Sequence, residues 1–213
     1  MAKDIYELVN YLGLDKINLL GHDIGGMVAM SFAFNYPQLV NKLIVMDGAH
    51  PGEGMMHMTM IPKAGTFTDK MDSNMPYVWW MAFNQVKNLP EKLLAGRFNY
   101  LLEYLFSYVM LDDTKMSDFE RQVYASAYNK PENIRASNAW YQSFTQDIED
   151  AKQYEKLTMP VLGIGSNSSY NYIKMSLPYI ADNCTVEGIL DSGHYMNEER
   201  PEKVISLVTN FLQ

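Results

Sequence analysis

Asp23 occupies the middle of a short turn, Gly21-His22-Asp23-Ile24-Gly25-Gly26, with a small residue two positions away on either side. This spacing is typical of a nucleophile elbow, a strained turn between a strand and a helix that exposes its middle side chain at the C-terminal edge of a sheet. Small residues are expected at 21 and 25 because the two backbones nearly touch there. The helix that follows presents backbone N–H groups and a positive dipole end, which favour an anion. The sequence therefore indicates a carboxylate nucleophile, with a simple helix N-cap at Asp23 as the alternative.

Two further residues are suited to assist such a nucleophile. Asp47 follows one apolar, strand-like run, and His194 follows another, on a loop that contains glycine. Since ligand and catalytic groups gather at the carboxyl ends of parallel strands, we expect both residues near Asp23. Their order along the chain, nucleophile, acid and histidine, is the order of enzymes with this kind of elbow. Asn167 follows a third strand-like run, but an amide carries no charge, so the acid is assigned to Asp47. The alternatives are a structural role for His194 and a turn role for Asp47.

The identity of the nucleophile selects the reaction. An aspartate is ionised at neutral pH, because its reference pKa is about 3.9, and it needs no base before it attacks. Asp23 can therefore attack a saturated carbon directly and form an alkyl ester. His194, oriented by Asp47, then takes a proton from water, which attacks the ester carbonyl. This chemistry requires no metal and no cofactor, and we expect neither.

The elements around these residues predict an α/β protein with a parallel sheet. Strand, helix and strand patterns follow one another over 17–20, 27–35 and 42–46, which indicates a parallel βαβ unit. The other expected elements are strands at 161–164 and 185–190 and helices at 5–12 and from 201 onward.

The stretch 53–156 has helical patterns and no convincing strand, and it is rich in aromatic residues and Met. We expect it to be a helical cap inserted into a core that consists of 1–52 and 157–213. Its aromatic and Met side chains would form an apolar pocket between cap and core. Such a pocket suits a hydrophobic small-molecule substrate.

The composition argues against several classes of protein. Acidic residues outnumber basic ones by 25 to 17, and the net charge is -8, so the basic stripe of a nucleic-acid groove is missing. No apolar run approaches the roughly 20 residues of a membrane span, and the N-terminus lacks the apolar core of a signal peptide. Cys184 is the single cysteine, so no internal disulfide is expected. We expect a cytoplasmic protein without nucleic acid or membrane partners.

The chain resembles the epoxide hydrolase and haloalkane dehalogenase branch of the α/β-hydrolase fold over about residues 3–212. The turn at 21–26 is similar to the nucleophile elbow of that branch. The segment 79–85, followed by Leu89-Pro90-Glu91, resembles its first cap helices. The segment 134–141 resembles the part of the cap that carries the epoxide-activating tyrosine. The resemblance implies an epoxide hydrolase-like enzyme that works through an ester on Asp.

The resemblance also implies roles for individual residues. Tyr141 matches the tyrosine that donates a proton to the epoxide oxygen. Trp80 lies near the position of a halide-binding tryptophan, which keeps a haloalkane or haloacid dehalogenase as the alternative. Ile24 stands where many dehalogenases carry Trp and where fluoroacetate-type enzymes carry Arg, and its backbone N–H is an oxyanion donor. Phe83 stands near the place of a second cap tyrosine, and His22 flanks the elbow.

The sheet of the resembled fold has eight strands, with the elbow after the fifth, whereas here the elbow begins at residue 21. The resemblance thus implies a partial sheet that lacks the first strands and one oxyanion-hole donor. The strand at 17–20 would then be an edge with unpaired backbone groups. This leaves two alternatives open, a catalytically impaired fragment and an interaction module that pairs through this edge, including with a second copy as a homodimer.

Overall fold

The computed structural model describes residues 1–48, 50–62, 64–65, 70–72 and 76–213. The chain forms two compact units, each treated separately below. The first, here called the sheet unit, consists of Met1–Pro51, Ala151–Asp191 and Arg200–Gln213. The second, here called the helical unit, consists of Gly52–Asp150 and Ser192–Glu199. The segment that carries His194 therefore belongs to the helical unit.

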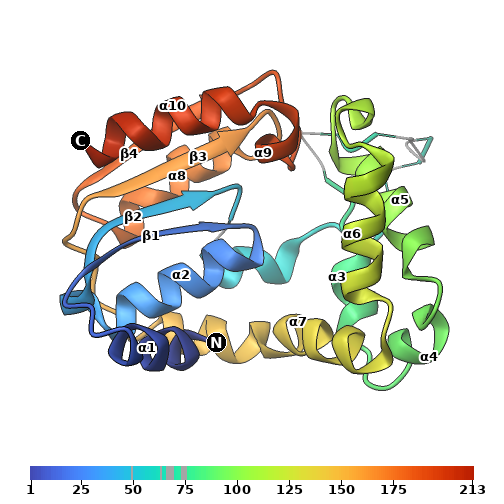
Figure 1. The fold of residues 1–213 in the computed structure, drawn as a ribbon, viewed down its shortest axis with the longest axis horizontal. Coiled ribbons are helices and arrows are strands. Elements are labelled where there is room, and N and C mark those ends of the chain that lie inside the picture. The colour runs from blue at the N-terminus through green and yellow to red at the C-terminus, as the bar shows by residue number, and fades with distance from the viewer. Residues whose placement is uncertain (49, 63, 66–69, 73–75) are drawn as a thin grey trace. The chain divides into compact units, whose positions relative to one another are not determined.

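The sheet unit contains a four-stranded parallel sheet in the order β1-β2-β3-β4 (Figure 1). The strands are β1 (Ile17–His22), β2 (Val40–Met46), β3 (Val161–Ser166) and β4 (Cys184–Ile189). Figure 1 shows β2 in blue beside β3 in orange, although a long stretch of chain separates them. These strands confirm the α/β fold class. β1 continues past the predicted run because Gly21 and His22 still pair in register with Val45 and Met46.

Helices and a short 3₁₀ turn lie before, between and after the strands of this sheet. They are α1 (Ala2–Tyr11), α2 (Ile24–Asn35), a 3₁₀ turn (Pro37–Leu39), α8 (Tyr170–Ile180) and α10 (Pro201–Leu212). One apolar core joins α1, α2 and α8 to β2 and β3, and it includes Phe32, Leu43 and Leu177. The sequence of α2, IGGMVAMSFAFN, is apolar on nearly every side, which suits a helix buried between α1 and the sheet. Its burial holds the turn at Asp23 against β1.

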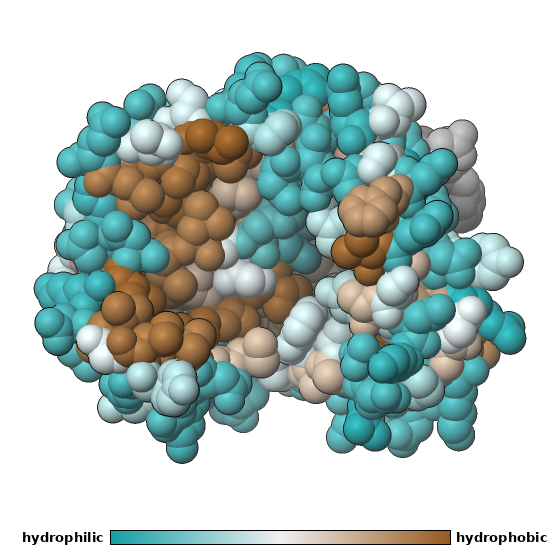
Figure 2. Space-filling view, in the orientation of Figure 1, coloured by the Kyte–Doolittle hydropathy of each residue, from teal (hydrophilic) through white to brown (hydrophobic). Residues whose placement is uncertain are grey.

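β1 lies at one end of the strand order, as the resemblance implied for 17–20. In the described part of the chain, its only strand partner is β2. Side chains along β1 alternate between partly buried and exposed positions, and Leu20 is 44% exposed. Figure 2 shows hydrophobic residues gathered over the face of the sheet unit in this view. Among the exposed apolar side chains of this unit are Leu8, Leu12 and Leu14.

The helical unit is built from helices around a core of aromatic and aliphatic residues. Its elements are a 3₁₀ helix (Glu53–His57), α3 (Trp79–Gln85), α4 (Pro90–Leu94), α5 (Phe98–Val109), a 3₁₀ turn (Asp113–Lys115), α6 (Asp118–Tyr128), α7 (Pro131–Ala151, whose last residue belongs to the sheet unit) and α9 (Met196–Glu199). Ser117 begins α6 with a capping box that includes Glu120, a strong start signal for a helix. Phe106 and Ile134 are fully buried in the core of this unit. No helix among the described residues is long and apolar enough to cross a membrane.

Candidate functional site

The backbone at Asp23 has the strained conformation that the elbow requires. Asp23 has φ 53° and ψ -123° and directly precedes α2. A residue other than glycine rarely adopts a positive φ, and the strain costs about 1–3 kcal/mol. The Asp23 side chain makes no capping hydrogen bond to α2; the backbone carbonyl accepts from the N–H groups of Gly26 (2.9 Å) and Met27 (3.2 Å) instead. Asp23 is therefore the N-cap residue of α2 by position, but its side chain does not cap the helix.

Glycine is required on the strand side of this turn. A Cβ at Gly21 would lie 2.1 Å from the carbonyl oxygen of Gly25, whereas a Cβ at Gly25 would meet nothing within 4 Å. Gly26 is the tighter position on the helix, since its Cβ would lie 3.1 Å from Cγ1 of Val45. The expectation that residue 25 itself must be small is thus corrected. Its backbone, not its missing side chain, is what approaches Gly21.

Gly21→Ala is expected to lower the free energy of unfolding by about 3 kcal/mol, because backbone atoms must move to admit the methyl group. Gly25→Ala is the matched control and should be neutral or stabilise by up to about 1 kcal/mol, since alanine favours helix. Urea unfolding of both variants measures the difference. Equal losses in the two variants would contradict the close approach at Gly21.

Asp47 lies beside the elbow, at the end of the neighbouring strand. His22 pairs with Met46 in register, and the backbone N–H of Asp23 donates to the carbonyl oxygen of Met46 at 3.0 Å. Asp23 and Asp47 therefore follow paired positions of β1 and β2. This juxtaposition agrees with the expectation that the carboxyl ends of parallel strands meet at one edge.

The Asp47 carboxylate is held by the last residue of β3 and by the loop that follows it. Its Oδ1 accepts from the backbone N–H of Ser166 at 3.0 Å and from the hydroxyl of Ser169. The Asp47 backbone is also fixed, with φ 44° and an N–H that donates to Ile164 at 2.9 Å. These contacts set the direction of the side chain. Sequence reasoning missed both serines, although they flank Asn167, where an acid was sought.

The other predicted residues of the sheet unit lie at the elbow itself. Ile24 is the first residue of α2, so its N–H belongs to the end of the helix where backbone donors lack partners within the helix. His22 is the last residue of β1 and is half-buried. Burial lowers the pKa of His50 from 6.5 to about 4, and its ring lies edge-on to Phe34. His50 is therefore neutral at pH 7 and adds no positive charge.

In the helical unit, His194 lies on a segment bound to the end of α5. Its backbone N–H donates to the carbonyl oxygen of Val109 at 3.0 Å, and its half-buried ring lies 5.1 Å from that of Tyr195. The Tyr195 ring in turn packs edge-on against Phe106. Sequence reasoning placed His194 on the loop after the last strand. In the structure, the part of this loop from Ser192 onward belongs to the helical unit.

The predicted aromatic residues lie on two different helices. Trp80 and Phe83 both belong to α3, where Trp80 lies edge-on to Tyr108 at 5.9 Å and Phe83 lies 6.0 Å from Trp79. Tyr141 lies on α7 and is half-buried, with its ring 5.3 Å from Phe144. The structure thus brings Trp80 and Phe83 together on one helix and places Tyr141 on another.

A hydrogen bond between Tyr124 and Glu198 in the helical unit was not predicted from the sequence. The Tyr124 hydroxyl donates to Glu198 Oε1 at 2.7 Å. Burial, and then the hydrogen bond to Glu198, raise the pKa of Tyr124, so the phenol keeps its proton. This contact ties α6 to the segment that carries His194. Within the described residues, no group of three His, Cys, Asp or Glu side chains is arranged to hold a metal ion.

Comparison with known proteins identifies a family and several similar chains. The family described as the alpha/beta hydrolase fold matches residues 1–201. The chain is 29% identical to the soluble epoxide hydrolase of Corynebacterium sp. (strain C12), over 99% of this chain and 72% of that protein. It is 26% identical to epoxide hydrolase 1 of Caenorhabditis elegans, over 100% of this chain and 52% of that protein.

Solved structures similar to this chain cover nearly all of it. The epoxide hydrolase CorEH is 26% identical, with a TM-score of 0.80 over 99% of this chain and 72% of that chain. Cfl2 from Burkholderia cenocepacia is 25% identical, with a TM-score of 0.84 over 100% of this chain and 70% of that chain. The chain thus spans between about half and three quarters of the length of these relatives.

Proposed function

Because this chain belongs to the alpha/beta hydrolase fold family, we propose that it hydrolyses epoxides through a covalent ester on Asp23. The observation that carries the proposal is the elbow itself, where a carboxylate residue has φ 53° and its side chain does not cap α2. An ordinary capping aspartate gains its stability from that hydrogen bond. Strain without the capping bond is typical of a residue held for chemistry. The similarity to two epoxide hydrolases supports the same conclusion.

In the first step, an Asp23 carboxylate oxygen bonds to one carbon of the epoxide, and the ring C–O bond breaks. The electron pair of that bond moves to the epoxide oxygen, which becomes an alkoxide. Tyr141 donates its phenolic proton to this oxygen, as the resemblance implies for its position. The product of the step is a hydroxyalkyl ester on Asp23.

In the second step, His194 removes a proton from water, and the hydroxide formed attacks the ester carbonyl carbon. The oxyanion that develops is stabilised by the Ile24 N–H at the positive end of α2. The acyl C–O bond then breaks, and the diol leaves with a proton from His194. Asp23 emerges as the carboxylic acid and passes its proton through water to the Tyr141 phenolate, which restores both groups. Asp47 holds the imidazole in one orientation and stabilises its protonated form.

We propose a hydrophobic small molecule as the substrate. The helical unit carries aromatic side chains on α3 and α5, among them Trp80 and Tyr108 in ring contact. Aromatic and other apolar side chains are the usual lining of small-molecule sites. In this proposal, residues 53–156 act as a cap over a catalytic core formed by 1–52 and 157–213.

A dehalogenase is the second candidate, because Trp80 on α3 matches the position of a halide-binding tryptophan in the resembled branch. The two candidates differ in the leaving group. A halide departs as a stable anion, whereas an alkoxide needs a proton. The role of Tyr141 therefore separates them.

Tyr141→Phe is expected to lower kcat for an aryl epoxide by about 10²–10⁴-fold, the usual contribution of a general acid. The measurement compares hydrolysis of an aryl epoxide with halide release from a haloalkane of similar size. Tyr179→Phe, an exposed tyrosine on α8, is the control and should change neither rate. Halide release that exceeds epoxide hydrolysis and is indifferent to Tyr141→Phe would favour the dehalogenase.

A further inference from the structure

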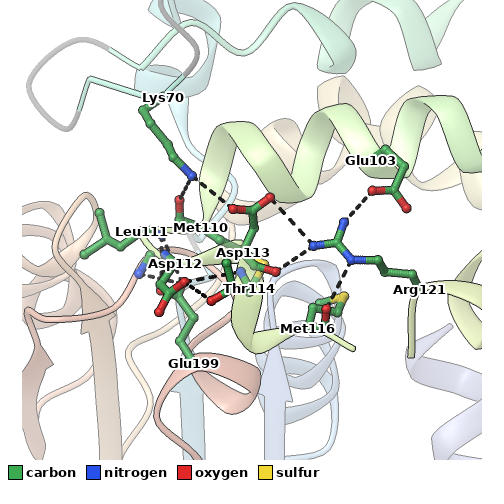
Figure 3. A network of polar contacts seen from close by, with 11 residues as sticks. Lys70, Glu103, Met110, Leu111, Asp112, Asp113, Thr114, Met116, Arg121 and Glu199 are labelled. Atoms are coloured by element: carbon green, nitrogen blue, oxygen red, sulfur yellow. Dashed lines mark hydrogen bonds and ion pairs between the residues drawn. The ribbon is translucent and has the colours of Figure 1, made fainter. Parts of the chain in front are cut away.

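The carboxylate of Glu199 is buried at the C-terminal end of the segment Ser192–Glu199, here called the His194 segment. The side chain is 3% exposed. Its Oε1 accepts from the backbone N–H of Gly193 at 2.9 Å, and its Oε2 accepts from the N–H groups of Leu111 and Asp112, both at 3.1 Å (Figure 3). A buried carboxylate is costly unless it is hydrogen-bonded. Three backbone donors satisfy this one.

These donors come from two segments that are far apart in the sequence. Gly193 is the residue immediately before His194, whereas Leu111 and Asp112 follow α5. Glu199 therefore joins the backbone beside His194 to the loop at the end of α5. Hydrogen bonds to a charged group are stronger than those between neutral groups. The Glu199 carboxylate therefore links the two segments strongly.

Two other contacts fix the backbone at His194 and at the residue before it. The His194 N–H donates to Val109 at 3.0 Å. A Cβ at Gly193 would lie 2.2 Å from the carbonyl oxygen of Val109, so only glycine allows this approach. The backbone of Gly193 and His194 thus rests on the C-terminal end of α5.

The loop after α5 is itself held in place. Arg121 on α6 donates to the carbonyl oxygens of Asp113 (2.6 Å) and Met116 (3.1 Å) and pairs with the Glu103 carboxylate. Lys70 donates to the carbonyl oxygen of Met110 at 3.0 Å. Figure 3 shows these contacts converging around the same turn of chain. Glu199 therefore binds the His194 segment to a loop that other contacts hold in place.

We propose that Glu199 is a positioning residue that sets the place of His194 through the backbone of Gly193. The inference rests on the proposed function, in which His194 acts in the second step and not in the first. Displacement of His194 should therefore slow hydrolysis of the ester and leave its formation intact. Loss of alignment by about 1 Å can lower a rate by about 10²-fold.

The test is single-turnover kinetics of Glu199→Gln with an aryl epoxide, followed by intact-protein mass spectrometry. Glutamine keeps one acceptor oxygen but turns an NH₂ donor toward backbone N–H groups. Ester formation should stay within about 3-fold of the unmodified protein, and hydrolysis should slow by about 10²-fold, so that the ester accumulates. Glu202→Gln, an exposed glutamate on α10, is the matched control and should change neither rate.

The ratio of the two rates is the decisive quantity, because a loss of folded protein lowers both together. Hydrolysis at the native rate in folded Glu199→Gln would overturn the inference, as would equal slowing of both steps. If Glu199→Gln does not fold, Glu199→Asp, which keeps the charge but shortens the side chain, is judged by the same ratio. Failure of the proposed function itself looks different, since no ester then forms in His194→Gln or in any other variant.

Discussion

Replacement of Asp23 by alanine is expected to lower kcat for epoxide hydrolysis by at least about 10⁴-fold, because the variant has no carboxylate to form the ester. Removal of the nucleophile in a well-studied serine protease costs about 10⁶-fold, since the catalytic residues act as a unit. The residual rate would come from binding and from the backbone donors of the elbow. Steady-state hydrolysis of an aryl epoxide measures the loss.

The control for Asp23→Ala must separate chemistry from folding, because alanine at φ 53° retains the backbone strain. Thermal unfolding of the variant shows whether it is folded under assay conditions. Asp15→Asn, an exposed aspartate before β1, should leave turnover unchanged. A folded Asp23→Ala variant with a tenth or more of the native kcat would exclude Asp23 as the nucleophile.

Replacement of Asp47 by asparagine is expected to have the second-largest effect, about 10⁴-fold on kcat. This is the loss seen when the acid of a serine protease triad becomes an amide. The amide oxygen can still accept from Ser166 and Ser169, whose contacts hold the native carboxylate, so the loop after β3 should keep its structure. The negative charge that stabilises protonated His194 is lost. The ester should therefore form and persist, as mass spectrometry after a single turnover would show.

Asn167→Ala is the matched control for Asp47→Asn, because Asn167 follows β3 in the same loop and is exposed. It should leave both steps unchanged. Native turnover in Asp47→Asn would mean that the carboxylate only braces the loop after β3. A large loss in Asn167→Ala would instead move the functional residue to that loop.

The sheet and the elbow were predictable from sequence because local signals decide them. Apolar runs bounded by glycine indicate buried parallel strands, and Gly21 with Asp23 indicates a strained turn between strand and helix. In a parallel βαβ unit, the C-terminal ends of the two strands lie side by side, as the pairing of His22 with Met46 shows. The position of Asp47 beside the elbow was therefore also predictable. The size requirement at Gly25 was wrong because a spacing pattern cannot tell which of two touching backbones lacks room.

The contacts that orient the site residues were not predictable in the same way. Ser169 reaches Asp47 across 122 positions of the sequence, and Glu199 reaches Leu111 across 88. No periodicity encodes such contacts. Glu199 in particular binds backbone N–H groups, which every residue except proline carries. Only the fold shows which of these groups face a buried carboxylate.

The most direct test of the account is a search for the covalent ester in His194→Gln. The variant is mixed with excess aryl epoxide, and the intact mass is followed before peptides are sequenced by mass spectrometry. We expect an increase equal to the whole mass of one epoxide, since ring opening adds the molecule without loss of an atom, and we expect it on Asp23. A folded variant with no increase, or with the added mass on another residue, would contradict the ester on Asp23.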